Sequence, residues 1–355
     1  MPSRTIDSVL KDNNGIGLGF GFLRLALAML ILFWHCFALS YGIEWSIATL
    51  HGPYRYFIML LVPAFFSLSG FLVAASLLRQ ENLRVFLLFR VLRILPALVT
   101  ETMLSAFVLG VLATSLPLAA YLRAPDFTAY MLNILGIVHF QLPGVFDHNP
   151  WPSYVNFSLW TLPAELYCYM MLAVLMLAGI HRERRLLLGV FLLCAAGLAF
   201  VQMPDVLPQT SSNIFSRPML LCCFASGNLL YFWRERVRLS PVLLVLSLLC
   251  YAFVIYIFPP LAFLLGSAAI AYATVYIGLS RLPKIPLLMR GDYSYGIYLY
   301  SYPIQQTVVW LFPSLRQYYW VFLIAAPATV LFAMFSYHCI EKPALSLRKR
   351  FTPQR

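Results

Sequence analysis

The sequence predicts an all-α, polytopic membrane protein: a bundle of about ten transmembrane helices with both termini in the cytoplasm. The first observation is the composition: 61% of the 355 residues are hydrophobic and 11% are charged. Soluble domains are about 45–50% apolar and about 25% charged, and a soluble fold of this size could not hide so much apolar surface. Two further observations are apolar runs near the roughly 20 residues of a spanning helix and an uneven distribution of basic residues between them.

Ten apolar segments define the predicted helices. They are residues 20–40, 56–78, 86–114, 157–180, 185–201, 214–233, 241–258, 261–279, 293–313 and 318–340. Pro259 and Pro260 separate the seventh segment from the eighth. Because proline cannot continue a helix without loss of a hydrogen bond, this pair predicts a tight turn.

The basic residues give the orientation. Arginine and lysine follow every even-numbered segment: Arg79, Arg84, Arg90, Arg93; Arg182, Arg184, Arg185; Arg234, Arg236, Arg238; Arg281, Lys284, Arg290; Lys342, Arg348, Lys349, Arg350, Arg355. The other side retains little more than Arg55, Arg123 and Arg316. Since cytoplasmic connections carry the excess of basic residues, this asymmetry predicts that both chain ends face the cytoplasm.

The domain organisation follows from these segments. Residues 1–19 are predicted to be a cytoplasmic N-terminal segment without the pattern of a cleavable signal peptide. Residues 20–340 are predicted to form the transmembrane domain, and residues 341–355 a basic cytoplasmic tail. The longest outside connection is 115–156, a length that is uncommon in loops without a function. Within it, the apolar run 128–141 is too short to span and predicts an interfacial or re-entrant segment.

The basic charge and the cysteines predict neither a nucleic-acid partner nor a metal site or disulfide framework. A net charge of +12 would suggest nucleic acid in a soluble protein, but here the basic residues lie between apolar runs and indicate topology, so no nucleic-acid partner is expected. The seven cysteines lie in apolar stretches without a CxxC pair or a metal-ligand spacing. They are interpreted as buried apolar side chains, and neither a metal site nor a disulfide framework is predicted.

The first segment holds Arg24 and His35. Polar groups inside apolar runs usually line a cavity or mark function, because charge in hydrocarbon is costly. Eleven residues are almost three helical turns, so both side chains should lie on one face, about 16 Å apart along the axis. The alternatives are a snorkelling anchor for Arg24 and a hydrogen-bonded structural histidine for His35.

Glu165 lies two or three turns inside the fourth segment, at a predicted depth near that of His35. A buried carboxylate needs a partner, so His35 is one candidate and a protonated packing carboxylate is the alternative. Arg90 and Arg93 lie at the cytoplasmic entrance of the third segment and share a helix face. Arginine binds phosphate bidentately, which favours a phosphate-bearing donor; a topology anchor is the alternative.

With these residues in view, the chain resembles the acyltransferase-3 family of integral membrane O-acyltransferases. The resemblance is carried by Arg24 and His35, the Phe65–Leu72 run FFSLSGFL, the Arg90–Pro96 run RVLRILP, the Trp160–Tyr167 run WTLPAELY, the Ser294–Leu299 run SYGIYL, and Glu341–Lys342–Pro343. It covers nearly the whole chain. Two positions depart from the family pattern: Ser301 stands where many members have histidine, and Gly21, Phe22 and Leu23 stand where an aspartate often precedes the arginine.

The resemblance implies about ten helices and transfer of an acyl group, most often acetyl from acetyl-CoA, to sugars of surface polysaccharide, lipopolysaccharide or another glycan. It implies that His35 is essential, that Arg24 takes the place of the family arginine, and that Arg90 and Arg93 are associated with the donor. Some members carry a fused extracytoplasmic hydrolase-like domain. This sequence shows none, so we expect direct acylation or a separate partner.

These expectations combine into one mechanism. His35 would take the proton of a sugar hydroxyl as general base, with Glu165 orienting the imidazole and Arg24 near the donor; a covalent acyl-histidine is a variation. Acyl-CoA is the expected donor substrate, and no cofactor is expected to be bound permanently. The expected partners are a carbohydrate or glycolipid acceptor, the lipid bilayer of a bacterial inner membrane, and polysaccharide-assembly proteins. The competing hypothesis is a transporter or flippase of a glycan or lipid-linked substrate, although no related halves are visible.

Overall fold

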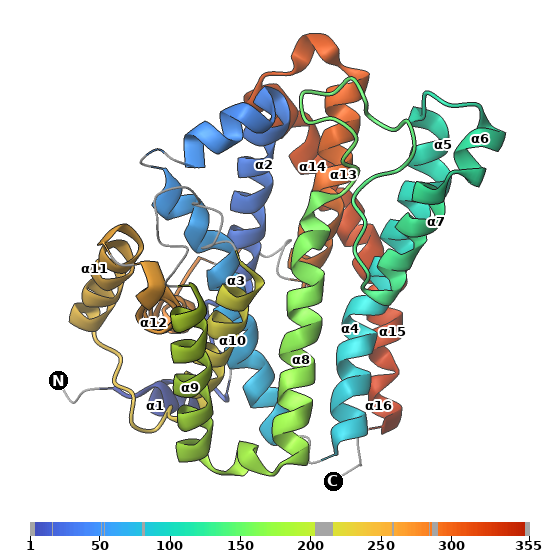
Figure 1. Ribbon diagram of the computed structural model, residues 1–355. Coiled ribbons are helices and arrows are strands. Elements are labelled where there is room, and N and C mark those ends of the chain that lie inside the picture. The colour runs from blue at the N-terminus through green and yellow to red at the C-terminus, as the bar shows by residue number, and fades with distance from the viewer. Residues whose placement is uncertain are drawn as a thin grey trace. The chain divides into compact units, whose positions relative to one another are not determined.

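The computed structural model describes residues 4–15, 17–50, 52, 54–79, 82–202, 216–257, 259–283, 285 and 290–351. These residues are mainly helical and contain three isolated β-bridges but no strand, so the predicted all-α class is confirmed (Figure 1). Of the basic residues used for orientation, Lys284 and Arg355 lie outside the described residues, as does the start of the predicted segment 214–233. The chain divides into two compact units, which are described separately.

The first unit comprises Met1–Leu27, Pro53–Phe86 and Ala164–Met289. Its helices are α1 (Ile6–Asp12), the start of α2 (Phe20–Leu50), α3 (Arg55–Arg79), most of α8 (Leu162–Leu177), α9 (Arg184–Gln202), α10 (Arg217–Phe232), α11 (Pro241–Ile257) and α12 (Leu265–Leu279). Helices α3, α10 and α12 pack against one another, and α11 packs against α12. The helix break predicted at Pro259 and Pro260 is confirmed, since α11 ends at Ile257 and a 3-10 turn, Pro259–Phe263, precedes α12.

Two glycines set the distance between α3 and α10. A side chain on Gly70 would collide with the carbonyl oxygen of Phe224, and one on Gly227 would collide with that of Ser67. The two contacts are reciprocal, so each helix presents a glycine to the backbone of the other. Small residues allow membrane helices to approach closely, and here the approach is close enough that no Cβ fits.

Helix α1 packs onto the connection that follows α10. Thr5 caps the helix by accepting a hydrogen bond from the Ser8 amide at 3.2 Å, which satisfies one of its free N–H groups. The Ile6 amide donates to the carbonyl of Val237 at 3.0 Å, and Arg234 donates to the Asp7 carboxylate at 3.0 Å. The described part of segment 1–19 is therefore tied down by backbone and side-chain bonds.

The second unit comprises Ala28–Gly52, Leu87–Pro163 and Arg290–Arg355. It contains the remainder of α2, most of α4 (Leu83–Leu104), α5 (Gly110–Ala113), α6 (Leu118–Arg123), α7 (Pro125–Met131), α13 (Ser294–Leu311), α14 (Tyr318–Ser336), α15 (Lys342–Ser346) and α16 (Arg348–Phe351). Helices α13 and α14 pack along each other (Figure 1). One π-helical turn, Ser105–Leu109, joins α4 to α5, and another, Tyr337–Glu341, joins α14 to α15.

Residues 114–156, here called the cap, fold around a hydrophobic cluster of their own. Tyr121, Tyr130 and Phe146 are at most 1% exposed in this cluster, which also includes Ala106 of the π-helical turn. Two β-bridges, Thr114 with Val145 and Gln141 with Tyr154, tie the segment together. Residues 128–141 form no single segment: α7 and a 3-10 turn, Leu132–Leu135, occupy the first part, and extended chain follows Gly136.

Each of the ten predicted segments coincides with helix in the described residues. By length and hydropathy, six of the described helices can cross a bilayer: Phe20–Thr49, Tyr56–Arg79, Leu83–Ala113, Phe157–Leu177, Leu261–Leu279 and Tyr318–Ser346. Pro241–Ile257 is apolar but shorter. The count of ten spans and the cytoplasmic placement of both ends stay predictions.

Candidate active site

His35 lies in α2 within the second unit, and its side chain is 9% exposed. Its ring meets the ring of Tyr302 from α13 edge-on, with centroids 5.2 Å apart and planes at 81°. The Nδ1 atom of His35 and the hydroxyl of Tyr302 are both buried and make no hydrogen bond to any described residue. Because buried polar atoms are normally paired, this place suits a bound molecule that supplies the partners.

Gln305 fixes the turn of α2 that carries His35. Its side chain is fully buried, and its amide nitrogen donates to the Leu32 carbonyl at 2.7 Å and to the Cys36 sulfur at 2.8 Å. These two acceptors lie on either side of His35 in the chain. A glutamine of α13 therefore holds the backbone of α2 at the histidine, and Tyr302 lies one turn earlier on the same helix.

Arg93 of α4 lies among carboxylates. Its guanidinium donates to Asp292 at 2.7 Å and to Glu341 at 3.4 Å, and it lies over the ring of Tyr295 at 5.4 Å. Ser294 donates to the second oxygen of Asp292 at 2.7 Å. Three of the sequence motifs that carry the resemblance, those of Arg93, Ser294 and Glu341, therefore meet at one place in the second unit. Arg90 is half-buried one turn earlier on α4.

Arg24 and Glu165 belong to the first unit and are both half-buried. Arg24 lies in α2, which continues without a break from Phe20 past His35 to the kink at Gly42. Glu165 lies in the first turn of α8 and accepts a hydrogen bond from Tyr169 at 2.6 Å. Because Glu165 and His35 belong to different units, their proposed partnership stays a prediction, as do the roles of all five predicted site residues.

Glu101 is a buried carboxylate that the sequence analysis missed. It lies in α4 and is 1% exposed. One carboxylate oxygen accepts hydrogen bonds from Asn156 at 2.8 Å, Ser105 at 2.9 Å and Tyr130 at 3.3 Å. The amide of Asn156 also donates to the Leu299 carbonyl of α13 at 2.9 Å. Glu101 thus joins the cap and α13 to α4, and its place in an apolar segment was the signal that could have identified it.

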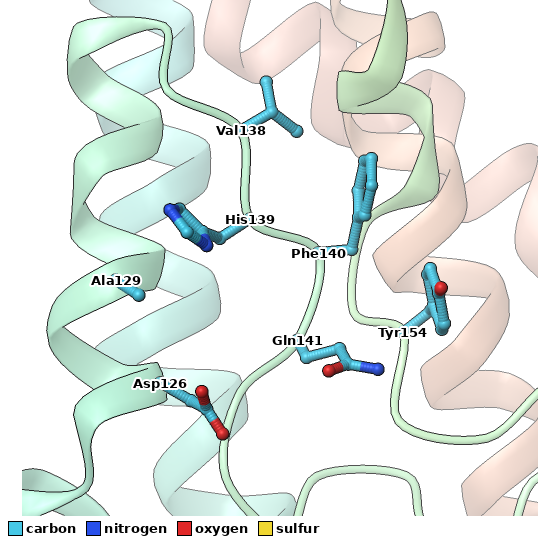
Figure 2. A pocket seen from close by; sticks show the side chains of 7 residues that line it. All are labelled: Asp126, Ala129, Val138, His139, Phe140, Gln141 and Tyr154. Carbon is cyan, nitrogen blue, oxygen red and sulfur yellow. The ribbon is translucent and has the colours of Figure 1, made fainter.

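The cap contains a pocket of about 210 Å³. Figure 2 shows the residues that line it: Asp126 and Ala129 from α7, the run Val138, His139, Phe140 and Gln141, and Tyr154. Asp126 and Gln141 are exposed and Ala129 is half-buried, so the pocket can be reached from outside. In the described part of the chain, no three His, Cys, Asp or Glu side chains gather as metal ligands would.

The comparisons with known proteins agree with the fold and these motifs. The sequence profile of the acyltransferase-3 family, described as an acyltransferase domain, matches residues 18–338. The chain belongs to this family. Family membership and the apolar helices make it a multi-pass integral membrane acyltransferase.

Two relatives cover most of the chain. An O-acetyl transferase of Shigella phage Sf6 is 28% identical over 295 residues, which are 79% of this chain and 83% of the relative. Nodulation protein 10 of Rhizobium leguminosarum bv. viciae is 27% identical over 326 residues, 83% of this chain and 84% of the relative. No solved structure matches the chain. Family membership favours the acyltransferase hypothesis over the transporter alternative.

Proposed function

We propose that this chain is an O-acetyltransferase that moves the acetyl group of cytoplasmic acetyl-CoA, or another acyl group from its CoA ester, to a carbohydrate hydroxyl. The acceptor would be a sugar of surface polysaccharide, lipopolysaccharide or another glycan at the bacterial inner membrane. The observation that carries the proposal is the likeness to the O-acetyl transferase of Shigella phage Sf6 over 79% of the chain. The buried histidine with an unpaired ring nitrogen supports it.

His35 would act as the general base. A sugar hydroxyl is a weak nucleophile, and a positioned histidine that accepts its proton typically contributes a factor of about 10² to 10⁴ in rate. The oxygen would attack the thioester carbonyl, and CoA would leave as the thiol after taking up a proton. Burial next to Tyr302 and the clamp of Gln305 on α2 support this role, because both hold the imidazole in one place. Transfer through an acyl-histidine remains the variation.

Glu165 would orient the imidazole and stabilise its charged form, and Arg24 would lie near the donor. Arg90 and Arg93 would hold donor phosphates. Arg93 already binds two carboxylates, but a guanidinium has five N–H donors. It could therefore donate to phosphate while retaining Asp292. Polysaccharide-assembly proteins are the proposed protein partners.

The first test is transfer of label from radiolabelled acetyl-CoA in membranes that contain an envelope glycan fraction as acceptor. The wild type is compared with His35→Ala and with His181→Ala, a matched control from the connection after α8. We expect His35→Ala to lose transfer by about 10²-fold or more and His181→Ala to retain it. Full transfer by folded His35→Ala would contradict the proposed base. Absence of transfer by the wild type with acetyl and other acyl donors would favour a transporter.

A further inference from the structure

The pocket in the cap combines two kinds of wall. On the α7 side lie the carboxylate of Asp126 and the imidazole of His139, and on the other side lie Phe140, Gln141 and Tyr154 (Figure 2). The rings of Phe140 and Tyr154 are stacked, with centroids 5.6 Å apart and planes at 21°. Specific small-molecule sites are largely apolar or aromatic with a few placed polar groups, and this pocket has that composition.

The chain around the pocket is fixed before any ligand binds. Asn133, which is fully buried, donates to the His139 carbonyl at 2.9 Å and accepts from the His139 amide at 2.8 Å. Gly136 makes the reversal between them, with a φ of 80° that favours glycine. The Val155 amide donates to the Phe140 carbonyl at 2.7 Å. A preformed wall avoids the entropic cost of ordering on binding.

Ring contacts lead from the pocket to His35 within the second unit. Phe140 meets Phe157 with centroids 5.3 Å apart, Phe157 meets Tyr302 at 6.3 Å, and Tyr302 meets His35. The adjacent glutamines of α13 make a second connection. Gln305 bonds to α2 around His35, while the amide of Gln306 donates to the carbonyls of Trp151 and Tyr154 at 2.9 and 2.8 Å. The pocket and the histidine are therefore positioned by the same helix.

We propose that this pocket binds a sugar unit of the acceptor glycan, and that it selects a neutral or amino sugar. This inference rests on the proposed function. A pyranose presents an apolar C–H face, which suits the Phe140 and Tyr154 rings, and an edge of hydroxyls, which suits Asp126, His139 and Gln141. The Asp126 carboxylate accepts hydrogen bonds from hydroxyl or ammonium groups. Its negative charge repels uronates and other acidic sugars. Since the rings of Phe157 and Tyr302 stand between the pocket and His35, the bound unit is a neighbour of the sugar that is acylated.

The first experiment measures binding without catalysis. The purified full chain, in detergent, is applied to an array of defined neutral, amino and acidic oligosaccharides. The pocket variants are Asp126→Asn, Gln141→Ala and Tyr154→Ala, with Tyr154→Phe to separate the ring from its hydroxyl. Asp147→Asn and His148→Ala are matched controls, because both residues are exposed in the cap and line no part of the pocket.

We expect the wild type and both controls to retain neutral or amino oligosaccharides, and Asp126→Asn and Tyr154→Ala to bind them about tenfold more weakly. Tyr154→Phe should keep most of the binding. Equal binding by pocket variants and wild type overturns the proposal, as does the absence of any retained neutral or amino sugar. Asp126 and Gln141 are exposed, so their substitution leaves the cap core intact. Asp126→Asn and Gln141→Ala therefore still test the pocket if Tyr154→Ala fails to fold.

Transfer kinetics separate this inference from the proposed function. With radiolabelled acetyl-CoA and the retained oligosaccharide as acceptor, pocket variants should raise the acceptor KM about tenfold and leave kcat nearly unchanged, because they remove uniform binding. If the wild type transfers label and the pocket variants match its KM, the pocket inference fails while the O-acetyltransferase proposal stands. If oligosaccharides are retained but no label moves from any acyl donor, the proposed function fails and the pocket is a glycan site.

Discussion

The two compact units bury different kinds of side chain. In the described residues of the first unit, the buried polar groups are mainly hydroxyls, with Asn228 in α10 and Asp7 in α1. The second unit buries larger polar groups: His35, Glu101, Asn133, Asn149, Asn156, Gln305, Gln306 and Glu341. In the first unit, α3 and α10 meet through glycine against backbone. Side-chain hydrogen bonds of Glu101, Gln305 and Gln306 join segments of the second unit to one another.

This difference has a physical consequence. Lipid chains are as apolar as leucine, so apolar side chains give membrane helices little preference for one another, and close packing or internal hydrogen bonds must supply it. The contact of α3 with α10 in the first unit depends on close packing, which tolerates changes of polarity but not of side-chain volume. The contacts of Glu101 and Gln305 in the second unit depend on buried hydrogen bonds, so loss of either the donor or the acceptor is costly. The units should therefore respond to different substitutions.

The largest effect is expected for Gly227→Ala at the contact of α10 with α3. The added methyl group would meet the backbone of Ser67, which cannot move aside as a side chain can. Overpacking typically costs about 1–3 kcal/mol, and we expect the upper end or more here. The free energy of unfolding of the purified protein in mixed micelles, measured by titration with a denaturing detergent, gives the value.

Gly189→Ala and Gly197→Ala are the matched controls for this substitution. Both glycines lie in α9, and a Cβ on either would have no neighbour within 4 Å. Alanine favours a helix over glycine by about 1 kcal/mol, so both variants should be as stable as the wild type or more stable. A loss from Gly227→Ala no larger than the change at Gly189 would show that shape does not hold α3 and α10 together.

A smaller loss is expected for Glu101→Ala in the second unit. The change leaves the side chains of Ser105, Tyr130 and Asn156 without an acceptor that they now share. A buried donor left unpaired costs about 1–3 kcal/mol, and we expect about 2 kcal/mol because Asn156 keeps its bond to Leu299. The same unfolding titration measures it.

Glu101→Gln provides the comparison, since its amide oxygen can still accept. We expect it to cost less than about 1 kcal/mol, because the neutral amide oxygen replaces most of the lost pairing. If alanine and glutamine cost the same, hydrogen bonding at Glu101 does not stabilise the second unit.

The smallest effect is expected at the charged pair of α1. The hydrogen bond from Lys11, at 2.7 Å, and then that from Arg234 lower the pKa of Asp7, although burial opposes them. A carboxylate with a lowered pKa stabilises the fold above its unfolded pKa of about 3.9, and this contribution is lost as pH falls through the folded value. Asp7→Asn should therefore cost less than about 1 kcal/mol at pH 7.

The pH dependence checks the sign. The difference in melting temperature between the wild type and Asp7→Asn, measured in detergent, should be constant from pH 7 to about pH 5 and shrink below about pH 4. A difference that grows on acidification would contradict the lowered pKa. A loss at pH 7 as large as that of Gly227→Ala would show that the first unit also depends on charge pairing.

The helices were largely predictable from the sequence, because apolar runs end at basic clusters or prolines. The predicted segment 241–258 corresponds to α11 at Pro241–Ile257. Helix α2 breaks at a kink at Gly42, two residues beyond the predicted end at residue 40, and a further helical stretch runs through Glu44 and Trp45 to Leu50. The end of the apolar run therefore lies close to the kink, whereas nothing in the run indicated that helix resumes after Gly42.

The polar contacts of the second unit were less predictable. Arg93 and Glu341 were singled out from their motifs, but their ion pair joins residues 248 apart in the chain, and no local pattern encodes such a pairing. Glu101 met the criterion applied to Glu165 and was overlooked. Gln305 and Gln306 gave no signal, because a neutral amide in an apolar run has the same appearance whether it clamps a helix or faces a neighbour.

The cap has a consequence for how relatives of this protein could diversify. Its core is largely its own, and bridges at Thr114 with Val145 and at Gln141 with Tyr154 keep distant parts of the segment together. Such a segment can be exchanged as a cassette between relatives without redesign of the helices. The exchange has fixed points where cap side chains hydrogen-bond outside the segment: Tyr130 and Asn156 to Glu101, Tyr121 to the Ala106 carbonyl, and Asn149 to Gln306. Chimaeras that keep these four residues and vary the remainder of the cap would sample different pockets on the same helices.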